Sequence, residues 1–285
     1  MNASAAQGYD HLSNSDFKLL AEFIEAYCGI RMPPAKKTLV EGRLRRRVRA
    51  LGLSSLGEYC RFLFEGDGLR SETVQLIDAV TTNKTDFFRE PDHFQMLTER
   101  VMPELLKRPD RPGLDRPLSV WSAAASTGAE AYTLAMVLDE FSQRTRGIRF
   151  SILATDICTD VLEQAKLAIY PEDMLTPVPA QFRHRYFMRS RDAESAKVRV
   201  APAIRQMVRF GRLNLMDATY PLEQMDVIFC RNILIYFDKD IQQAVLSRLC
   251  QHLRPGGYLF LGHAETVTGM KLPLRQVVTS LFIRK

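Results

Sequence analysis

The feature that most constrains the fold is the segment LSVWSAAASTGAE at residues 118–130, taken together with the acid at Asp156. A short apolar run ends in small residues and one glycine, Gly128, and a segment with helical periodicity follows at residues 131–141. This order predicts a strand, a loop and a helix, in which small side chains let the backbone lie against a ligand. A second apolar run, at residues 148–154, ends in Thr155 and Asp156, which predicts a carboxylate at the tip of the next strand.

Together these two strand ends predict a nucleotide-cofactor site. The pyrophosphate signature G-x-G-x-x-G is absent, because Gly128 is all that remains of it. A cofactor that has a ribose but no pyrophosphate fits better, and this favours S-adenosylmethionine. These two segments, without the rest of the chain, also fit a second interpretation. They could form an ordinary strand-to-helix turn followed by a strand that ends in an exposed acid.

The rest of the second half supports an α/β fold. The run MDVIFC at residues 225–230 predicts a buried strand, and residues 243–253 predict an amphipathic helix that stops at the Arg-Pro-Gly-Gly turn at residues 254–257. Residues 258–262 predict another strand, and the alternating tail at residues 276–284 predicts a closing strand pair. Five or more strands alternate with helices from about residue 95, which predicts a doubly wound sheet.

Composition predicts a cytoplasmic protein with neither a membrane span nor a secretory leader. The chain has 285 residues, of which 46% are hydrophobic and 25% are charged. A chain of this length and composition can bury a full core, and we expect it to divide into two domains. No apolar run reaches the roughly 18 residues that a span needs. The five cysteines are scattered and form no C-x-x-C pair, so reduced core thiols are expected. The five histidines lack ligand spacing, and no metal site is expected.

The first eighty residues have a different pattern from the rest. Helical periodicity recurs at residues 15–28, 36–51, 55–65 and 71–80, and strand-like alternation is lacking. This predicts a small helical domain over residues 1–80, with Ser13 or Ser15 as the first N-cap. A polar and then aromatic segment at residues 81–91 predicts a structured linker to a second domain at residues 92–285.

The second of these helices, KKTLVEGRLRRRVRAL, is the most charged element of the chain. Val40, Leu44, Val48 and Leu51 form its apolar stripe. Five arginines without an acid among them occupy the other faces: Arg43, Arg45, Arg46, Arg47 and Arg49. Such a run of charges usually forms a solvent-exposed helix face. The positive electrostatic potential of the five arginines would also attract an acidic partner, which could be nucleic acid, a membrane surface or an acidic protein.

Several motifs together resemble the CheR family, the chemotaxis receptor glutamate methyltransferases of bacteria. These are TTNKTDFFRE, WSAAASTGAEAYTLAM, ATDI, YFMR, LNL, IFCRNILIYFD and LRPGGYLFLGHAE. They stand in the family's order and at similar spacing, and the resemblance covers nearly the whole chain from about residue 15. The motifs TTNxTxFFRE and FCRNxxIYFD are not general methyltransferase motifs. The resemblance implies an N-terminal all-α domain and a Rossmann-like S-adenosylmethionine-binding domain. It also implies a small antiparallel β insertion, here at about residues 171–205, with two of its strands expected at residues 185–188 and 197–200 and a connecting turn at RSRDAESAK.

The resemblance also implies the site residues. Cofactor contacts carried over by motif are Asn83, Thr85, Arg89, Glu130, Asp156, Asn214, Leu215, Arg231 and Asn232. Arg89 and Tyr236 are the candidates for a direct part in methyl transfer. Ala129 and Ala131 depart from the family's GEEPYS pattern, and GHAE replaces the commoner GHSE, which leaves the shape of these loops open.

The expected reaction gives glutamate methyl esters and S-adenosylhomocysteine. A glutamate is already anionic at neutral pH, since its ordinary pKa is about 4.3, so the reaction needs in-line positioning and no general base. Partners implied are the cytoplasmic helices of methyl-accepting receptors, docked on the five arginines, and in some members a C-terminal receptor peptide added to the insertion's sheet. A monomer is expected.

Two other functions fit parts of the sequence. A nucleic-acid methyltransferase would explain the basic helix, but the motif [N/D]-P-P-[Y/F/W] that base methylation usually shows is replaced here by CRNIL. A catalytically silent module that binds the cofactor and tethers a receptor is the other alternative. The complete set of cofactor positions argues against it.

Overall fold

The computed structural model describes residues 10–145, 147–190, 192 and 195–285. The chain forms two compact units, Met1–Thr82 and Asn83–Lys285. The segment from Asn83 to Pro91, which carries the polar and aromatic motif, therefore belongs to the larger unit.

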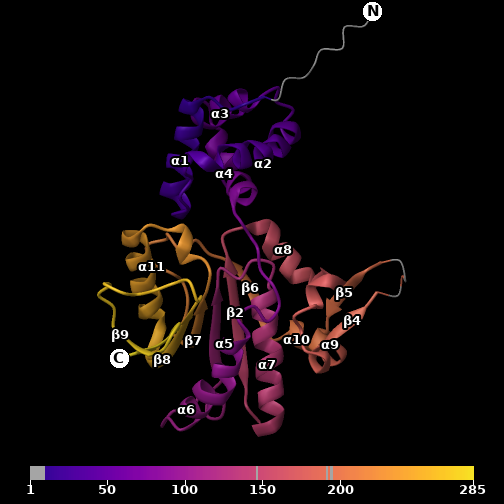
Figure 1. Ribbon diagram of the computed structural model, residues 1–285, viewed down its shortest axis with the longest axis vertical. Coiled ribbons are helices and arrows are strands. Elements are labelled where there is room, and N and C mark those ends of the chain that lie inside the picture. The colour runs from indigo at the N-terminus through magenta and orange to yellow at the C-terminus, as the bar shows by residue number, and fades with distance from the viewer. Residues whose placement is uncertain (1–9, 146, 191, 193–194) are drawn as a thin grey trace, which may run out of the picture. The chain divides into compact units, whose positions relative to one another are not determined.

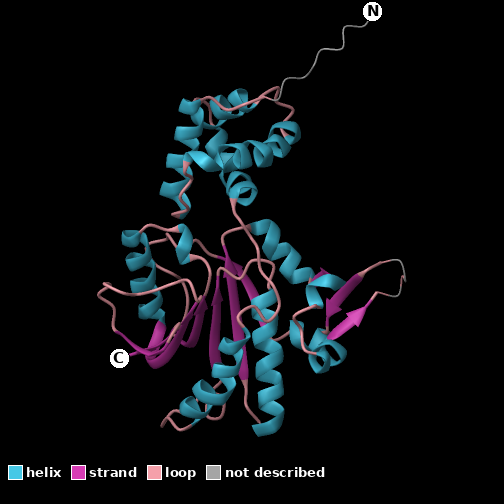
Figure 2. Ribbon diagram, viewed as in Figure 1, coloured by secondary structure: helices cyan, strands magenta, loops and turns pink. Residues whose placement is uncertain are grey.

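The first unit is helical (Figures 1 and 2). Its helices are α1 (Asn14–Cys28), α2 (Lys37–Ala50), α3 (Leu56–Phe64) and α4 (Gly68–Val80), with a 3₁₀ turn at Pro34–Lys36. Ser13 caps α1 by accepting a hydrogen bond from the Asp16 N–H, as one of the two expected caps. Leu20, Leu44 and Leu76 have no exposed surface and form part of the core between the helices.

The second unit is built on a seven-stranded sheet with the order β6-β2-β1-β7-β8-β10-β9. Its strands are β1 (Leu118–Ala123), β2 (Phe150–Asp156), β6 (Val208–Arg212), β7 (Met225–Cys230), β8 (Leu253–Leu261), β9 (Leu274–Val278) and β10 (Leu281–Arg284). Neighbours from β6 to β8 run parallel, and β10 is antiparallel to both β8 and β9. The expected doubly wound sheet with a closing strand pair is confirmed.

The connecting helices cover the sheet. They are α7 (Ala129–Thr145), α8 (Thr159–Leu167) and α11 (Lys239–His252). The connection through α7 moves from β1 to β2 in one direction along the sheet, and that through α11 moves from β7 to β8 in the other. Right-handed crossovers then put α7 and α11 on opposite faces (Figure 1). The strand order reverses beside β1, and ligands of such sheets bind there, at the carboxyl ends of the strands.

A helical segment precedes β1. It consists of α5 (Pro91–Met96), a π-helical turn at Leu97–Val101 and α6 (Met102–Leu106). Phe94, Leu97, Val101 and Leu105 are buried in the core of the larger unit. The packing of α5 fixes the residues just before it, which carry the FFRE motif, against that core.

The insertion after α8 contains a separate antiparallel sheet. It comprises β3 (Ile169–Pro171), a 3₁₀ turn at Glu172–Leu175, α9 (Ala180–Tyr186), β4 (Phe187–Arg189), β5 (Lys197–Val200) and α10 (Pro202–Arg205), with the strand order β3-β5-β4. The strand expected at residues 185–188 begins later, at Phe187, because Phe182 and Tyr186 are buried one helical turn apart and keep α9 helical. The turn expected at RSRDAESAK lies partly outside the described residues.

Two further details differ from the expectation. Residues 254–257 do not form a separate turn but belong to β8, whose pairing with β7 shifts register between Met225 and Val227. Gly256 takes a φ of +71° there, which glycine tolerates, so the chain bends within the strand. As expected, all five cysteines are free and buried. Among the described residues, no helix is both long and apolar enough for a membrane crossing.

Candidate active site

The candidate site lies at the carboxyl ends of β1, β2, β6 and β7 in the larger unit. The loop after β1 is tightly turned: Ala124, Ser126 and Gly128 have φ of 59°, 51° and 85°. Left-handed conformations cost energy for residues other than glycine, and such strain gathers at functional sites. The loop is held in place by the Ala125 N–H, which donates to the Thr155 carbonyl at 2.9 Å.

Asp156 stands at the end of β2 and links three segments. Its buried carboxylate accepts hydrogen bonds from the backbone N–H groups of Ser126 (2.8 Å) and Cys158 (2.9 Å). An ionised carboxylate accepts hydrogen bonds at both of its oxygens, and hydroxyl groups are among the donors that it takes. The arrangement fits the expected contact with a ribose.

The polar motif at the start of the larger unit reaches the same place. The side-chain nitrogen of Asn83 lies 3.4 Å from the Cys158 sulfur, and the backbone carbonyl of Asn83 accepts a hydrogen bond from the Ser126 hydroxyl at 2.8 Å. Thr85 is half-buried two residues later. The structure thus brings Asn83 beside the ends of β1 and β2, as a cofactor contact there requires.

Asn214 and Leu215 follow β6 and are both buried. The N–H of the preceding Leu213 donates to the Asp156 carbonyl at 3.0 Å, which ties this segment to the end of β2. The Asn214 side-chain oxygen accepts from the Met216 N–H at 3.0 Å. An amide and an apolar side chain therefore stand next to Asp156.

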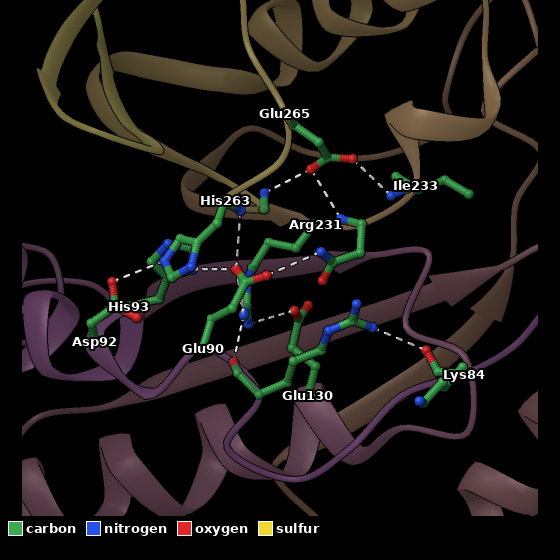
Figure 3. Close-up of polar contacts among 12 residues, drawn as sticks. Lys84, Glu90, Asp92, His93, Glu130, Arg231, Ile233, His263 and Glu265 are labelled. Carbon is green, nitrogen blue, oxygen red and sulfur yellow. Dashed lines mark hydrogen bonds and ion pairs between the residues drawn. The ribbon is translucent and has the colours of Figure 1, made fainter.

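Arg231, directly after β7, is the centre of a buried ion-pair network (Figure 3). Its guanidinium lies 3.1 Å from a Glu130 oxygen and 3.0 Å from a Glu90 oxygen, and it donates to the Arg89 carbonyl. Its side chain is 1% exposed and lies over the ring of Phe94. Arg231 and Glu130 are brought together, but each is already engaged by the other.

The pKa values of Glu130 and Glu90, the two carboxylates paired with Arg231, are shifted in opposite directions. Burial raises the pKa of Glu130, although Arg231 and the Ser122 hydroxyl oppose the rise. Burial also acts to raise the pKa of Glu90, but the Asn232 side-chain amide and Arg231 outweigh it and lower that pKa overall. Glu90 is therefore held as an anion at neutral pH.

The two candidates for methyl transfer lie on loops at this end of the sheet. Arg89 is half-buried, and its guanidinium donates to the Lys84 carbonyl at 3.2 Å (Figure 3). Tyr236 is half-buried at the end of a 3₁₀ turn, Leu234–Tyr236, that follows β7. Asn232 precedes this turn in a left-handed conformation, with φ of 60°, and its side-chain amide donates to Glu90 at 3.1 Å.

The five arginines of α2, in the helical unit, do not share one environment. Arg43 donates to the carbonyls of Val80 and Thr81 at the end of α4, and Arg45 donates to the Asp10 carbonyl. Arg47 forms a two-pronged ion pair with the buried Glu72, at 2.6 and 2.9 Å.

The other two arginines of α2, Arg46 and Arg49, are exposed. Of the expected apolar stripe, Val40, Leu44 and Val48 are buried, whereas Leu51 is 38% exposed.

Four polar residues of the site were not predicted from the sequence: Glu90, His93, His263 and Glu265. Glu90, His93 and His263 could offer three ligand atoms within 4.8 Å of one another. However, both oxygens of Glu90 are engaged, one by the Asn232 amide and the other by Arg231, so we assign no metal ion to the group. Glu90 is the last residue of the FFRE motif, and Glu265 is the last residue of GHAE. Their place within these family motifs is the sequence signal that could have identified them.

Comparison with known proteins identifies both units. Residues 15–81 match the family model described as the CheR methyltransferase all-alpha domain, and residues 83–283 match the CheR methyltransferase SAM binding domain. Chemotaxis protein methyltransferase 2 of Pseudomonas aeruginosa is 37% identical over 95% of this chain and 94% of its own length. Chemotaxis protein methyltransferase of Klebsiella aerogenes is 41% identical over 89% of this chain and 84% of its own.

Proposed function

The chain belongs to the CheR methyltransferase family, and we propose that it methylates glutamate side chains of chemotaxis receptors. It is an S-adenosylmethionine-dependent methyltransferase, and the proposed products are glutamate methyl esters and S-adenosylhomocysteine. The name shared by its relatives, chemotaxis protein methyltransferase, supports receptors as the acceptors. The observation that carries the proposal is the position of Asp156, Asn214 and Asn232 at the carboxyl ends of β2, β6 and β7, on one edge of the parallel part of the sheet.

The residues at these strand ends fit the cofactor. The Asp156 carboxylate is held at the end of β2 by the backbone N–H groups of Ser126 and Cys158, and a carboxylate at this position is the group that binds ribose hydroxyls in nucleotide-cofactor folds. Asn83, Asn214 and Leu215 would line the same pocket. When bound, S-adenosylmethionine supplies an electrophilic methyl group on a sulfonium.

The site's own groups suit an acceptor that needs no base. The carboxylates of Glu90, Glu130 and Glu265 are all engaged by donors of the chain, and His93 is buried. None of them is placed to remove a proton, and a glutamate acceptor at neutral pH has none to lose, since its ordinary pKa is about 4.3. We assign to Arg89 and Tyr236 the orientation of the acceptor carboxylate in line with the methyl group.

The exposed face of α2 is the proposed receptor-docking surface, and its exposed arginines are Arg46 and Arg49. Receptor segments rich in glutamate are anionic before methylation, so these cations would speed the encounter and favour unmethylated segments. Arg43, Arg45 and Arg47, although part of the same run, would act mainly within the helical unit, because each is bonded there.

A labelling experiment tests the acceptor chemistry. Receptor membranes from a strain without this enzyme are incubated with the protein and methyl-labelled S-adenosylmethionine, and the labelled receptor is then treated with alkali. A carboxyl ester releases the label as volatile methanol, whereas a methyl group on nitrogen stays bound. Alkali-labile label on receptor is expected. Alkali-stable label, or label on added DNA instead, would contradict the proposal.

A further inference from the structure

Glu265 lies just after β8, and within the described part of the chain its carboxylate is hydrogen-bonded by backbone N–H groups. It is 8% exposed, and its carboxylate accepts four N–H hydrogen bonds, all of which except the one from Leu234 are drawn in Figure 3. The donors are Gly262 (2.7 Å), Asn232 (2.9 Å), Ile233 (2.9 Å) and Leu234 (2.7 Å). Burial raises the pKa of Glu265, and the four N–H groups oppose the rise.

Three of the four donors are consecutive residues of the loop after β7. Successive N–H groups around a left-handed residue form a concave anion-binding site, and Asn232 is that residue here, with φ of 60°. In many proteins an external anion fills such a site. In this protein the chain's own carboxylate, 31 to 33 residues further along, fills it.

The loop held in this way leads into the proposed chemistry. Asn232, whose N–H is fixed by Glu265, also has its side-chain amide fixed by Glu90 at 3.1 Å. Leu234, the last of the three donors, begins the 3₁₀ turn that ends at Tyr236. The position of the Tyr236 backbone therefore depends on a turn whose first residue is held by Glu265.

The packing around the carboxylate leaves little room for another arrangement. A Cβ atom on Gly262 would lie 2.6 Å from the Asn232 side-chain nitrogen and 3.0 Å from a Glu265 oxygen. Replacing the carboxylate by an amide would leave one oxygen for four donors and would direct an NH₂ group at two of them. A buried donor left without an acceptor is costly, so a glutamine here should move the loop.

We propose that Glu265 is a positioning residue for methyl transfer, which holds Asn232 beside the cofactor and Tyr236 beside the acceptor. The inference rests on the proposed roles of Asn232 and Tyr236. It makes the two loops after β7 and β8 one structural unit with a single anion at its centre.

The test compares Glu265→Gln with Glu223→Gln, an exposed glutamate before β7 that serves as the matched control. In receptor methylation at saturating substrates, Glu265→Gln should lower kcat on the order of a hundredfold, as expected when reacting groups are misplaced by about 1 Å. Its affinity for S-adenosylmethionine, measured by calorimetry without receptor, should fall several-fold through Asn232. The control should change neither quantity.

A double-mutant cycle separates positioning from a general loss of structure. Tyr236→Phe should lower kcat in the wild-type background but have little further effect with Glu265→Gln, because the tyrosine is then already displaced. If Glu265→Gln does not fold, Glu265→Asp keeps the charge, and it should lower kcat while thermal unfolding stays cooperative.

Normal kcat and normal cofactor affinity in the folded variants would overturn the inference, as would full additivity with Tyr236→Phe. The failure of the proposed function is a separate result. If the wild type methylates no receptor, calorimetry still tests whether Glu265 supports cofactor binding through Asn232, and an unchanged affinity would then overturn the inference.

Discussion

His93 is predicted to make the larger unit lose stability in mild acid. Its ring is fully buried in α5 and packed against Phe260 and His263. Neither ring nitrogen forms a hydrogen bond within the described part of the chain, although Nδ1 lies 3.4 Å from a Glu90 oxygen. Burial is the largest cause that lowers the pKa of His93, and the Arg231 guanidinium adds to it; although Asp92 and Glu90 act in the opposite direction, the pKa falls from 6.5 to about 4.

The sign and size of the effect follow from proton binding. In the unfolded chain His93 takes up a proton near pH 6.5, but in the folded protein only near pH 4, so the unfolded state holds one more proton between these values. Stability should therefore fall as the pH drops through this window, with a limiting slope of about 1.4 kcal/mol per pH unit. Fully expressed near pH 4, the loss amounts to about 3 kcal/mol.

The measurement uses the single tryptophan, Trp121, which is fully buried in β1 and so reports on the larger unit. Urea unfolding is followed by its fluorescence from pH 7.5 to 4 for the wild type and for His93→Phe, which keeps an aromatic ring without a titrating group. The two free energies of unfolding should diverge below pH 6.5, with the variant losing less. His184→Phe, at an exposed site on α9, is the control and should follow the wild type. Parallel curves for His93→Phe and the wild type would refute the argument.

The remaining predictions concern the cofactor, the docking surface and the helical unit. Asp156→Ala should weaken binding of S-adenosylmethionine and of its demethylated product by about 1 to 3 kcal/mol, and calorimetry showing unchanged affinity would contradict a ribose contact. Arg46→Glu with Arg49→Glu should raise the KM for receptor at low salt with little change in cofactor affinity, whereas an unaltered KM would mean that these arginines only solvate the helix. Glu72→Gln should destabilise the helical unit by about 2 to 4 kcal/mol, because it leaves Arg47 without its buried partner, and thermal unfolding followed by circular dichroism measures this loss.

The sequence predicted the elements better than their ends or their contacts. Strand β7 was expected at its observed bounds because a continuous apolar run has a clear start and finish. Helix α11 begins at Lys239, four residues before the apolar periodicity that predicted it, because Asp238 caps it by accepting from the Ile241 N–H. The helical segment before β1 was not predicted at all. Short elements broken by a π turn and a proline give no long periodic signal.

For the candidate site, too, the sequence predicted single residues better than the contacts between them. Residues on quoted motifs, such as Asp156 and Asn214, could be assigned because the motifs fix their position after a strand. The ring of donors around Glu265 could not be predicted, because it joins residues 31 to 33 positions apart whose partnership depends on which strands become neighbours. The same holds for Glu90, whose partners Arg231 and Asn232 are more than 140 positions away.

The arginine run on α2 shows why charge in a sequence does not measure charge on a surface. The helical period puts successive arginines about 100° apart, so five of them within seven residues cannot all face solvent while Val40, Leu44 and Val48 face the core. Those nearest the core need partners, and they find carbonyls at the end of α4 and the buried Glu72. A guanidinium at a helix C-terminus also stabilises the helix dipole. Most of the run is thus explained by the stability of the helical unit, and any electrostatic attraction of a receptor has to come chiefly from Arg46 and Arg49.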